Sequence, residues 1–219
     1  MLGKSTNDIH KWVTKAVVTT KEQLKFYIQA DHMMNRGTFK SSLKNRIRNF
    51  FAPDYIMKYL RTLRKVEYFS NTGGRLQYFY KAKQQRLGRR LGFSIAKNVF
   101  GYGLVIPHWG TIVVGDGNTI GNYAVLHTSI CITAGTKKIG DGFYCSTGAK
   151  ILNSVELGNN VTVGANAVVT RDFEANSLLM GIPAEKKRDA DVWYSGEWMR
   201  RINECEKLKI QMFPDGDKL

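Results

Sequence analysis

The stretch that decides the fold of this chain spans residues 113–170 and reads VVGDGNTIGNYAVLHTSICITAGTKKIGDGFYCSTGAKILNSVELGNNVTVGANAVVT. In it an aliphatic residue or a cysteine recurs every six residues, with one interval of seven: Val114, Ile120, Leu126, Ile132, Ile139, Cys145, Ile151, Leu157, Val163 and Val169. Neither the 3.6-residue period of a helix nor the two-residue period of a strand gives this spacing. A prism with one hexapeptide on each face does, and three hexapeptides then complete one coil.

Two further patterns support stacked coils. A glycine follows the aliphatic residue at five places, which indicates tight corners between faces: Gly115, Gly121, Gly140, Gly158 and Gly164. A second column of small or β-branched residues lies four residues after the first: Ala124, Ile130, Ala149, Val155, Val161 and Ala167. We therefore expect about five coils around an apolar axis, with glycines that shape corners and do not bind phosphate.

Charge divides the chain into two unlike parts. The 219 residues carry a net charge of +15, and residues 1–91 account for all of it, with 20 Lys and Arg against 5 Asp and Glu. Residues 92–219 hold 13 of each and are neutral. The basic surface is either simply well solvated or a contact for an anionic substrate or for membrane headgroups.

The compartment and the metal content follow from what the sequence lacks. No apolar run reaches the roughly 18 residues of a membrane span, and the N-terminus lacks the apolar run of a signal peptide. We expect a cytoplasmic protein, with the inner face of the membrane as an alternative. Cys131, Cys145 and Cys205 form no metal-binding pair, so no metal and no disulfide framework are expected.

The predicted organisation has three parts: a basic helical domain over 1–91, a β-helix domain over 92–189 and a helical tail over 190–219. Helix-like spacing of apolar residues occurs in five N-terminal segments and in one amphipathic segment of the tail: 7–15, 21–32, 40–50, 53–67, 75–90 and 191–212. Pro53 suits a first helical turn. The fold class is thus mainly β, with flanking helices.

The segment Gly101 to Gly121, with Ile106-Pro107-His108-Trp109-Gly110 at its centre, resembles the catalytic coil of the serine acetyltransferase branch of the hexapeptide-repeat acyltransferases. The closing Gly181-Ile182-Pro183-Ala184 is similar to the end of that family's repeat. The resemblance covers residues 92–189 and implies a left-handed parallel β-helix, a homotrimer and acetyl-coenzyme A bound between neighbouring coils.

Departures from the family pattern bear on the acceptor. The resemblance implies an Asp before the catalytic His, where this chain has Pro107, and an Arg-His pair where it has the short loop 135–138. Ser94 stands where the family has the Asp that orients the base. These departures argue against free serine as the acceptor. The overall pattern, a basic helical part followed by residues 91–95 and 106–114, resembles the serine-acetyltransferase-like enzymes of polysaccharide modification. This resemblance implies an O-acetyltransferase acting on a sugar hydroxyl of a bacterial capsular polysaccharide, exopolysaccharide or lipopolysaccharide, or of a precursor. Serine acetylation is the alternative enzyme, and a non-catalytic basic β-helix scaffold is the alternative outside enzymes.

His108 is the candidate general base. It lies six residues before Val114, where the repeat places an aliphatic residue, and an imidazole with a pKa near 6.5 suits proton removal from a hydroxyl at neutral pH. The alternative is a corner histidine with a structural role. His127, Trp109 and Asp116 are candidate acceptor contacts, with surface or packing roles as their alternatives. Backbone amides at Gly110 and Thr111 are candidates for stabilising the oxyanion.

Acetyl-coenzyme A is the expected co-substrate. Small residues at two turns would admit an extended pantetheine arm, and three basic residues would meet its phosphates: Ser146, Gly148, Ala149, Gly164, Ala165, Lys186, Lys187 and Arg188. The small residues would equally suit corners, and the basic ones an exposed tail. A carbohydrate acceptor, anionic or lipid-linked, is the second expected partner. Any peripheral membrane contact is expected to be made by the basic part, residues 1–91. No nucleic acid is expected, because the chain carries no nucleic-acid-binding signature.

Overall fold

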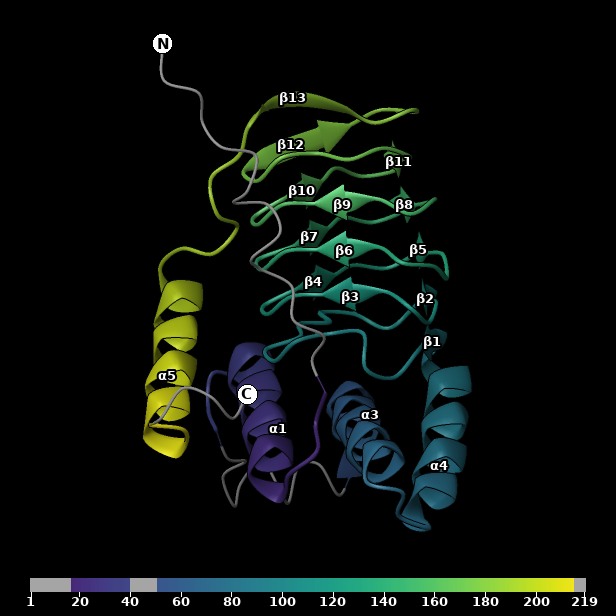
Figure 1. Ribbon diagram of the computed structural model, residues 1–219, viewed down its shortest axis with the longest axis vertical. Coiled ribbons are helices and arrows are strands. Elements are labelled where there is room, and N and C mark those ends of the chain that lie inside the picture. Colours follow the sequence, from purple (N-terminus) through teal and green to yellow (C-terminus); the bar gives the residue numbers. More distant parts are fainter. Residues whose placement is uncertain (1–16, 40–50, 215–219) are drawn as a thin grey trace.

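A computed structural model describes residues 17–39 and 51–214. A three-sided parallel β-helix stands on a base of helices, and the last helix lies beside the first (Figure 1). The expected helices over 7–15 and 40–50 lie outside the described residues, and the labels below follow Figure 1.

Three parallel sheets form the sides of the prism. The first side holds β1 (Phe93–Ile95), β2 (Ile112–Val114), β5 (Ile130–Ile132), β8 (Lys150–Ile151) and β11 (Val168–Val169). The second holds β3 (Thr119–Ile120), β6 (Lys138–Ile139) and β9 (Glu156–Leu157). The third holds β4 (Val125–Leu126), β7 (Tyr144–Cys145), β10 (Thr162–Val163), β12 (Ser177–Met180) and β13 (Glu185–Asp189), of which β13 pairs antiparallel with β12.

The predicted columns form the core. All ten residues of the hexapeptide series are at most 3% exposed, and the six residues of the second column are at most 1% exposed. Strand pairing stacks them in register, so that Ile132 pairs with Ile151 and Leu126 with Cys145. The extra residue in the seven-residue interval belongs to a corner loop, where the Lys137 ammonium donates to the Thr133 carbonyl oxygen at 2.8 Å.

The glycines that follow the column residues permit close packing of neighbouring coils, whereas the sequence suggested that they form the tight corners. Gly115, Gly121, Gly140, Gly158 and Gly164 do not have positive φ, and the left-handed corner positions belong to other glycines and to residues such as Asn160 and Asn166. A Cβ at Gly121 would lie 2.7 Å from the backbone nitrogen of Asp141 in the next coil. The lack of a side chain therefore permits coils to approach closely, which is a packing requirement.

We expect Gly121→Ala to lower the free energy of unfolding by about 1–3 kcal/mol, because the new methyl group collides with backbone and only a shift of the next coil relieves it. Chemical denaturation followed by far-UV circular dichroism measures this change. An unchanged midpoint would contradict the close approach of the two coils.

The N-terminal helices begin and end at identifiable signals. Helix α1 (Lys21–Arg36) starts at a capping box made by Thr20 and Gln23 and ends at Gly37, whose φ is +71°. Helix α3 (Tyr55–Asn71) is capped by the Asp54 side chain. Pro53 therefore precedes the cap, and its prediction as a first-turn residue was wrong: the Asp54 carboxylate takes the cap and displaces the helix start by two residues.

Helix α4 (Leu76–Leu91) carries much of the basic charge. It stops at Gly92, which has a φ of +80°, and of its residues only Gly88 and Leu91 are buried. Lys81, Lys83, Arg86, Arg89 and Arg90 are all exposed. No helix among the described residues is long and apolar enough to cross a membrane.

A buried ion network joins the helices to the first coil. The Arg64 guanidinium donates to both carboxylate oxygens of Asp31 at 2.8 and 3.2 Å and to Glu67 at 3.1 Å. It also donates to the backbone carbonyl oxygens of Phe100 and Gly101. Residues of α3 belong to the same hydrophobic cluster as the coil columns. The boundary near residue 91 thus separates types of secondary structure, and its role as a domain boundary stays a prediction.

The tail forms α5 (Glu197–Met212), which begins six residues later than the segment 191–212 predicts. Residues 185–189 add β13 to the third side instead. Ile202 and Cys205 bury α5 against α1, and the hydroxyls of Tyr102 and Tyr123 donate to Glu206. These contacts tie the tail to the coils that precede and follow His108.

Candidate active site

His108 lies in an extended corner of the first coil. Val105 pairs with Val125 and Ile112 pairs with Ile130, so the first coil has two more residues between these strands than the second. Ile106, which is fully buried, occupies the column position below Leu126. The prediction that His108 itself replaces a column residue was therefore wrong, because the longer corner moves it out of the column.

This corner is fixed at both ends and exposed between them. The Asn35 side chain donates to the Leu104 carbonyl oxygen at 2.8 Å and accepts from the Ile106 amide at 3.2 Å. Beyond the corner, the Gly110 amide donates to the Leu91 carbonyl oxygen at 2.9 Å. His108 is exposed and Trp109 is 72% exposed. The anchored loop therefore presents the His108 ring to solvent.

His127 is the neighbour of His108 on the next coil. A hydrogen bond of 2.7 Å joins its Nε2 to the Tyr144 hydroxyl of the coil above. Desolvation lowers the pKa of His127 from its ordinary value, and the charge of His108 lowers it further. Burial and the charge of His108 therefore both disfavour protonation of His127.

The coupling predicts a shift that NMR can measure. In His108→Ala the pKa of His127 should rise, because one cause of its depression is removed, yet stay below the ordinary value because burial remains. Titration of the histidine Cε1–H resonances between pH 4 and 9 measures the pKa of His127 in the parent protein and in the variant. An unchanged pKa of His127 would mean that the two rings do not interact.

Most of the predicted cofactor residues lie along the same edge of the prism. Ser146 follows β7 and is half-buried, and Ala165 follows β10 and is exposed. Gly148 has a φ of +80°, and a Cβ there would collide with the Asn166 side chain, so the corner itself requires glycine. Ala149 and Gly164 are buried, so Ala149 directs its side chain to the core. The N–H groups of Ala149 and Gly164 are also engaged, by the carbonyl oxygens of Ser146 and Leu179, so neither residue presents a free surface to a ligand.

The basic triplet belongs to β13, which adds to the third side beyond the last coil. Lys186 pairs with Asp189 at 2.7 Å and Lys187 pairs with Glu185 at 3.0 Å. Arg188 donates only to the Asp189 backbone carbonyl oxygen among the described residues. All three are exposed, and Arg188 has the most donors available to a phosphate.

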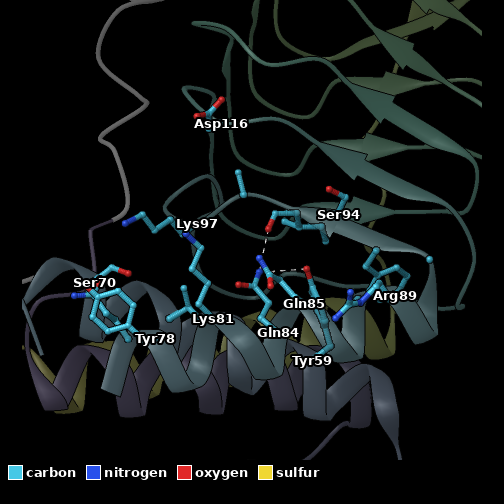
Figure 2. Close-up of a pocket in the computed structure, with 17 residues that line it drawn as sticks. Tyr59, Ser70, Tyr78, Lys81, Gln84, Gln85, Arg89, Ser94, Lys97 and Asp116 are labelled. Atoms are coloured by element: carbon cyan, nitrogen blue, oxygen red, sulfur yellow. Dashed lines mark hydrogen bonds between the residues drawn. The ribbon is translucent and has the colours of Figure 1, made fainter. Parts of the chain in front are cut away.

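Asp116 is not brought together with His108, because β2 lies between their corners. It lines a cavity of about 760 Å³ between α4 and the first coils, together with Ser94 and Lys97. Figure 2 shows Lys81, Gln84 and Arg89 of α4 facing the first coil across this cavity. Gln84 donates to the Ile95 carbonyl oxygen at 3.0 Å. Ser94 forms no hydrogen bond to His108.

The two candidate oxyanion donors differ in availability. The Gly110 amide is engaged by the Leu91 carbonyl oxygen, whereas the Thr111 amide has no hydrogen-bond partner within the described part of the chain. The Gly110 part of the prediction was therefore wrong, because backbone pairing with Leu91 uses its N–H. Thr111 remains the candidate donor.

Sequence inspection missed two residues of this site. Asn35, in the last turn of α1, anchors the corner from 69 positions away, and Tyr144 bonds His127 from the next coil. The sequence could have predicted Tyr144, since it precedes the column residue Cys145 and alternation turns its side chain outward. The sequence could not have predicted Asn35, because no repeat relates it to the corner.

The fold and this corner together define a hexapeptide β-helix with a solvent-exposed histidine on its first coil. No family model matches the chain. It is similar to a serine acetyltransferase of Buchnera aphidicola, with 29% identity over 169 residues that cover 72% of this chain and 60% of that protein. It is also similar to one of Staphylococcus aureus, with 33% identity over 100 residues, 42% of this chain and 44% of that protein.

Among solved structures, a serine acetyltransferase in complex with CoA matches with a TM-score of 0.57 and 21% identity, over 74% of this chain and 67% of that one. This likeness confirms the predicted left-handed parallel β-helix with flanking helices. The chain spans 44% to 60% of the length of these two curated relatives. The comparisons favour the serine acetyltransferase alternative over the polysaccharide-modifying branch, which they do not single out.

Proposed function

We propose that this protein is an acetyl-coenzyme A dependent O-acetyltransferase with His108 as its general base. The observation that carries the proposal is the exposed His108 on an anchored, lengthened corner of a β-helix, beside His127, in a chain similar to serine acetyltransferases. Acetyl-coenzyme A would lie along the edge marked by Ser146, Gly148 and Ala165. Arg188 would meet its phosphates.

In the proposed reaction a neutral His108 ring removes the proton of the acceptor hydroxyl while its oxygen attacks the thioester carbonyl carbon. The carbonyl oxygen becomes an oxyanion, which the Thr111 amide would stabilise. Collapse of the tetrahedral intermediate breaks the carbon–sulfur bond. The imidazolium returns its proton to the departing thiolate, so that free coenzyme A and an acetyl ester leave.

Two acceptors have support. Free L-serine is favoured by the relatives, which are serine acetyltransferases. A sugar hydroxyl of a surface polysaccharide or its precursor is favoured by this chain's own residues, since Pro107 and the short loop 135–138 replace the groups that the family resemblance assigns to serine binding. Both acceptors use the same base and the same donor.

Thiol release from acetyl-coenzyme A, measured with the purified chain, tests the function. The arms contain L-serine, nucleotide-linked sugars, oligosaccharides or no acceptor, and mass spectrometry of the products identifies the acetylated hydroxyl. Acceptor-dependent release supports the proposal, and the productive arm names the acceptor. Failure to bind coenzyme A or to turn over with every acceptor would favour a non-catalytic scaffold.

We also propose a homotrimer, as the family resemblance implies. Exposed Val113 and half-buried Cys131 lie on outward positions of the first side, near the His108 corner, where a second copy would cover them. Sedimentation velocity should give three times the mass of one chain. A stable monomer with full activity would contradict this assembly.

A further inference from the structure

A second cavity, of about 500 Å³, adjoins the His108 corner on the side of the helices. Pro107 and His127 form part of its wall, so the residue preceding the proposed base and the histidine coupled to it both face this space. The remaining walls come from the end of α1, the third side of the β-helix and the start of α5. The cavity thus depends on the tail folding back beside α1 (Figure 1).

Two arginine side chains line the cavity. Arg36 and Arg201 each pair with a carboxylate, Asp54 and Glu197 respectively, that lies outside the lining. Arg201 is held in place, because its Nη1 donates to the Met34 carbonyl oxygen at 2.8 Å and its guanidinium lies 4.6 Å from the centre of the Trp198 ring. Its Nη2 group has no hydrogen-bond partner among the described residues, so it can donate to an anion.

Aromatic rings supply the rest of the wall. Trp193 contacts Trp198 edge to face, with ring centres 5.4 Å apart, and lies 6.1 Å from the Tyr144 ring. The indole Nε1 of Trp193 is buried and makes no hydrogen bond to any residue in the described ranges. A buried indole N–H ordinarily has a partner, so this one is available to an oxygen of a ligand.

The cavity has room for a sugar ring. Its volume of about 500 Å³ falls within the usual range of small-molecule pockets. Aromatic faces suit the C–H faces of a sugar ring, and two guanidinium groups suit a carboxylate or a phosphate. We infer that this cavity binds the acceptor and that the acceptor is a pyranose sugar carrying a carboxylate or a phosphate.

This inference rests on the proposed function for the transfer step, but binding can be measured without it. Isothermal titration calorimetry of the full chain, without acetyl-coenzyme A, compares D-glucuronate, D-glucose 6-phosphate, neutral methyl glucoside and L-serine. The two charged sugars should bind at least about tenfold more tightly than the neutral one. The tighter of the two identifies the charged group.

Matched variants locate the binding. Arg201→Gln should weaken the charged sugar at least about tenfold, because a charge-assisted hydrogen bond is lost. Arg200→Gln is the control, since Arg200 also pairs with Glu197 but does not line the cavity. Trp193→Phe keeps an aromatic ring of smaller size and removes the N–H, so it tests the site even where Arg201→Gln loosens α5. Thermal melts check that each variant is folded.

Equal binding of methyl glucoside, or an equal loss in Arg200→Gln and Arg201→Gln, would overturn the inference. So would serine transfer by a chain that binds no sugar, although the proposed function would then stand. Binding of charged sugars with the expected variant pattern, but no acetyl transfer to them after acetyl-coenzyme A is added, would overturn their role as acceptors. The proposed function fails as well only if L-serine and the other acceptors also give no transfer.

Discussion

Replacing His108 with alanine should lower kcat by at least about 10²-fold, because a positioned general base contributes roughly 10²–10⁴ to the rate. The affinity for coenzyme A should stay within a few-fold, since the base acts on the acceptor proton and not on the cofactor. Initial rates of thiol release give kcat, and calorimetry gives the cofactor affinity.

His127→Ala is the matched comparison for this experiment. It removes a ring on the same edge, whose Nε2 is already engaged by Tyr144, so we expect a smaller loss. Near-normal turnover in a folded His108→Ala protein would remove His108 as the base. Equal losses in both variants would mean that the two histidines act as one unit.

The second large effect concerns stability. Arg64→Met should lower the free energy of unfolding by about 3–5 kcal/mol, because it leaves the buried carboxylates of Asp31 and Glu67 without their cation. Arg64 itself has a fully buried side chain. Burial works against its charged form, yet the two carboxylates raise the pKa of Arg64 above its ordinary value. Urea denaturation measures the loss.

Arg61→Met is the control, because Arg61 lies on the same helix, is only partly buried and has no hydrogen bond or ion pair to any described residue. Its effect should stay within about 0.5 kcal/mol of zero. An Arg64→Met protein as stable as the parent would show that the network contributes specificity of packing and little stability. The network also positions the His108 corner, since Asp31 accepts the Leu104 amide at 2.9 Å.

The repeat could be predicted from the sequence because its information is local and redundant. The ten column residues repeat at intervals of six with one exception, so the extra residue in the corner at Lys137 does not hide the period. The period gave a wrong position for His108, because the corner that holds it is longer than the repeat and moves it out of the column. The helix starts were less certain, because a cap such as Asp54 moves a boundary without altering the apolar pattern.

By itself, the sequence determined the prism and its columns, because both follow from spacing along one chain, and it singled out His108 without placing it correctly. Only the tertiary structure decided which residues surround that histidine. Asn35 and Arg201 come from helices at opposite ends of the chain. Asn35 contacts the first coil and Arg201 contacts the end of α1, through packing that no period records. Contacts between distant segments depend on side-chain shape and charge in three dimensions, so the cavity beside His127 had no signature in the sequence.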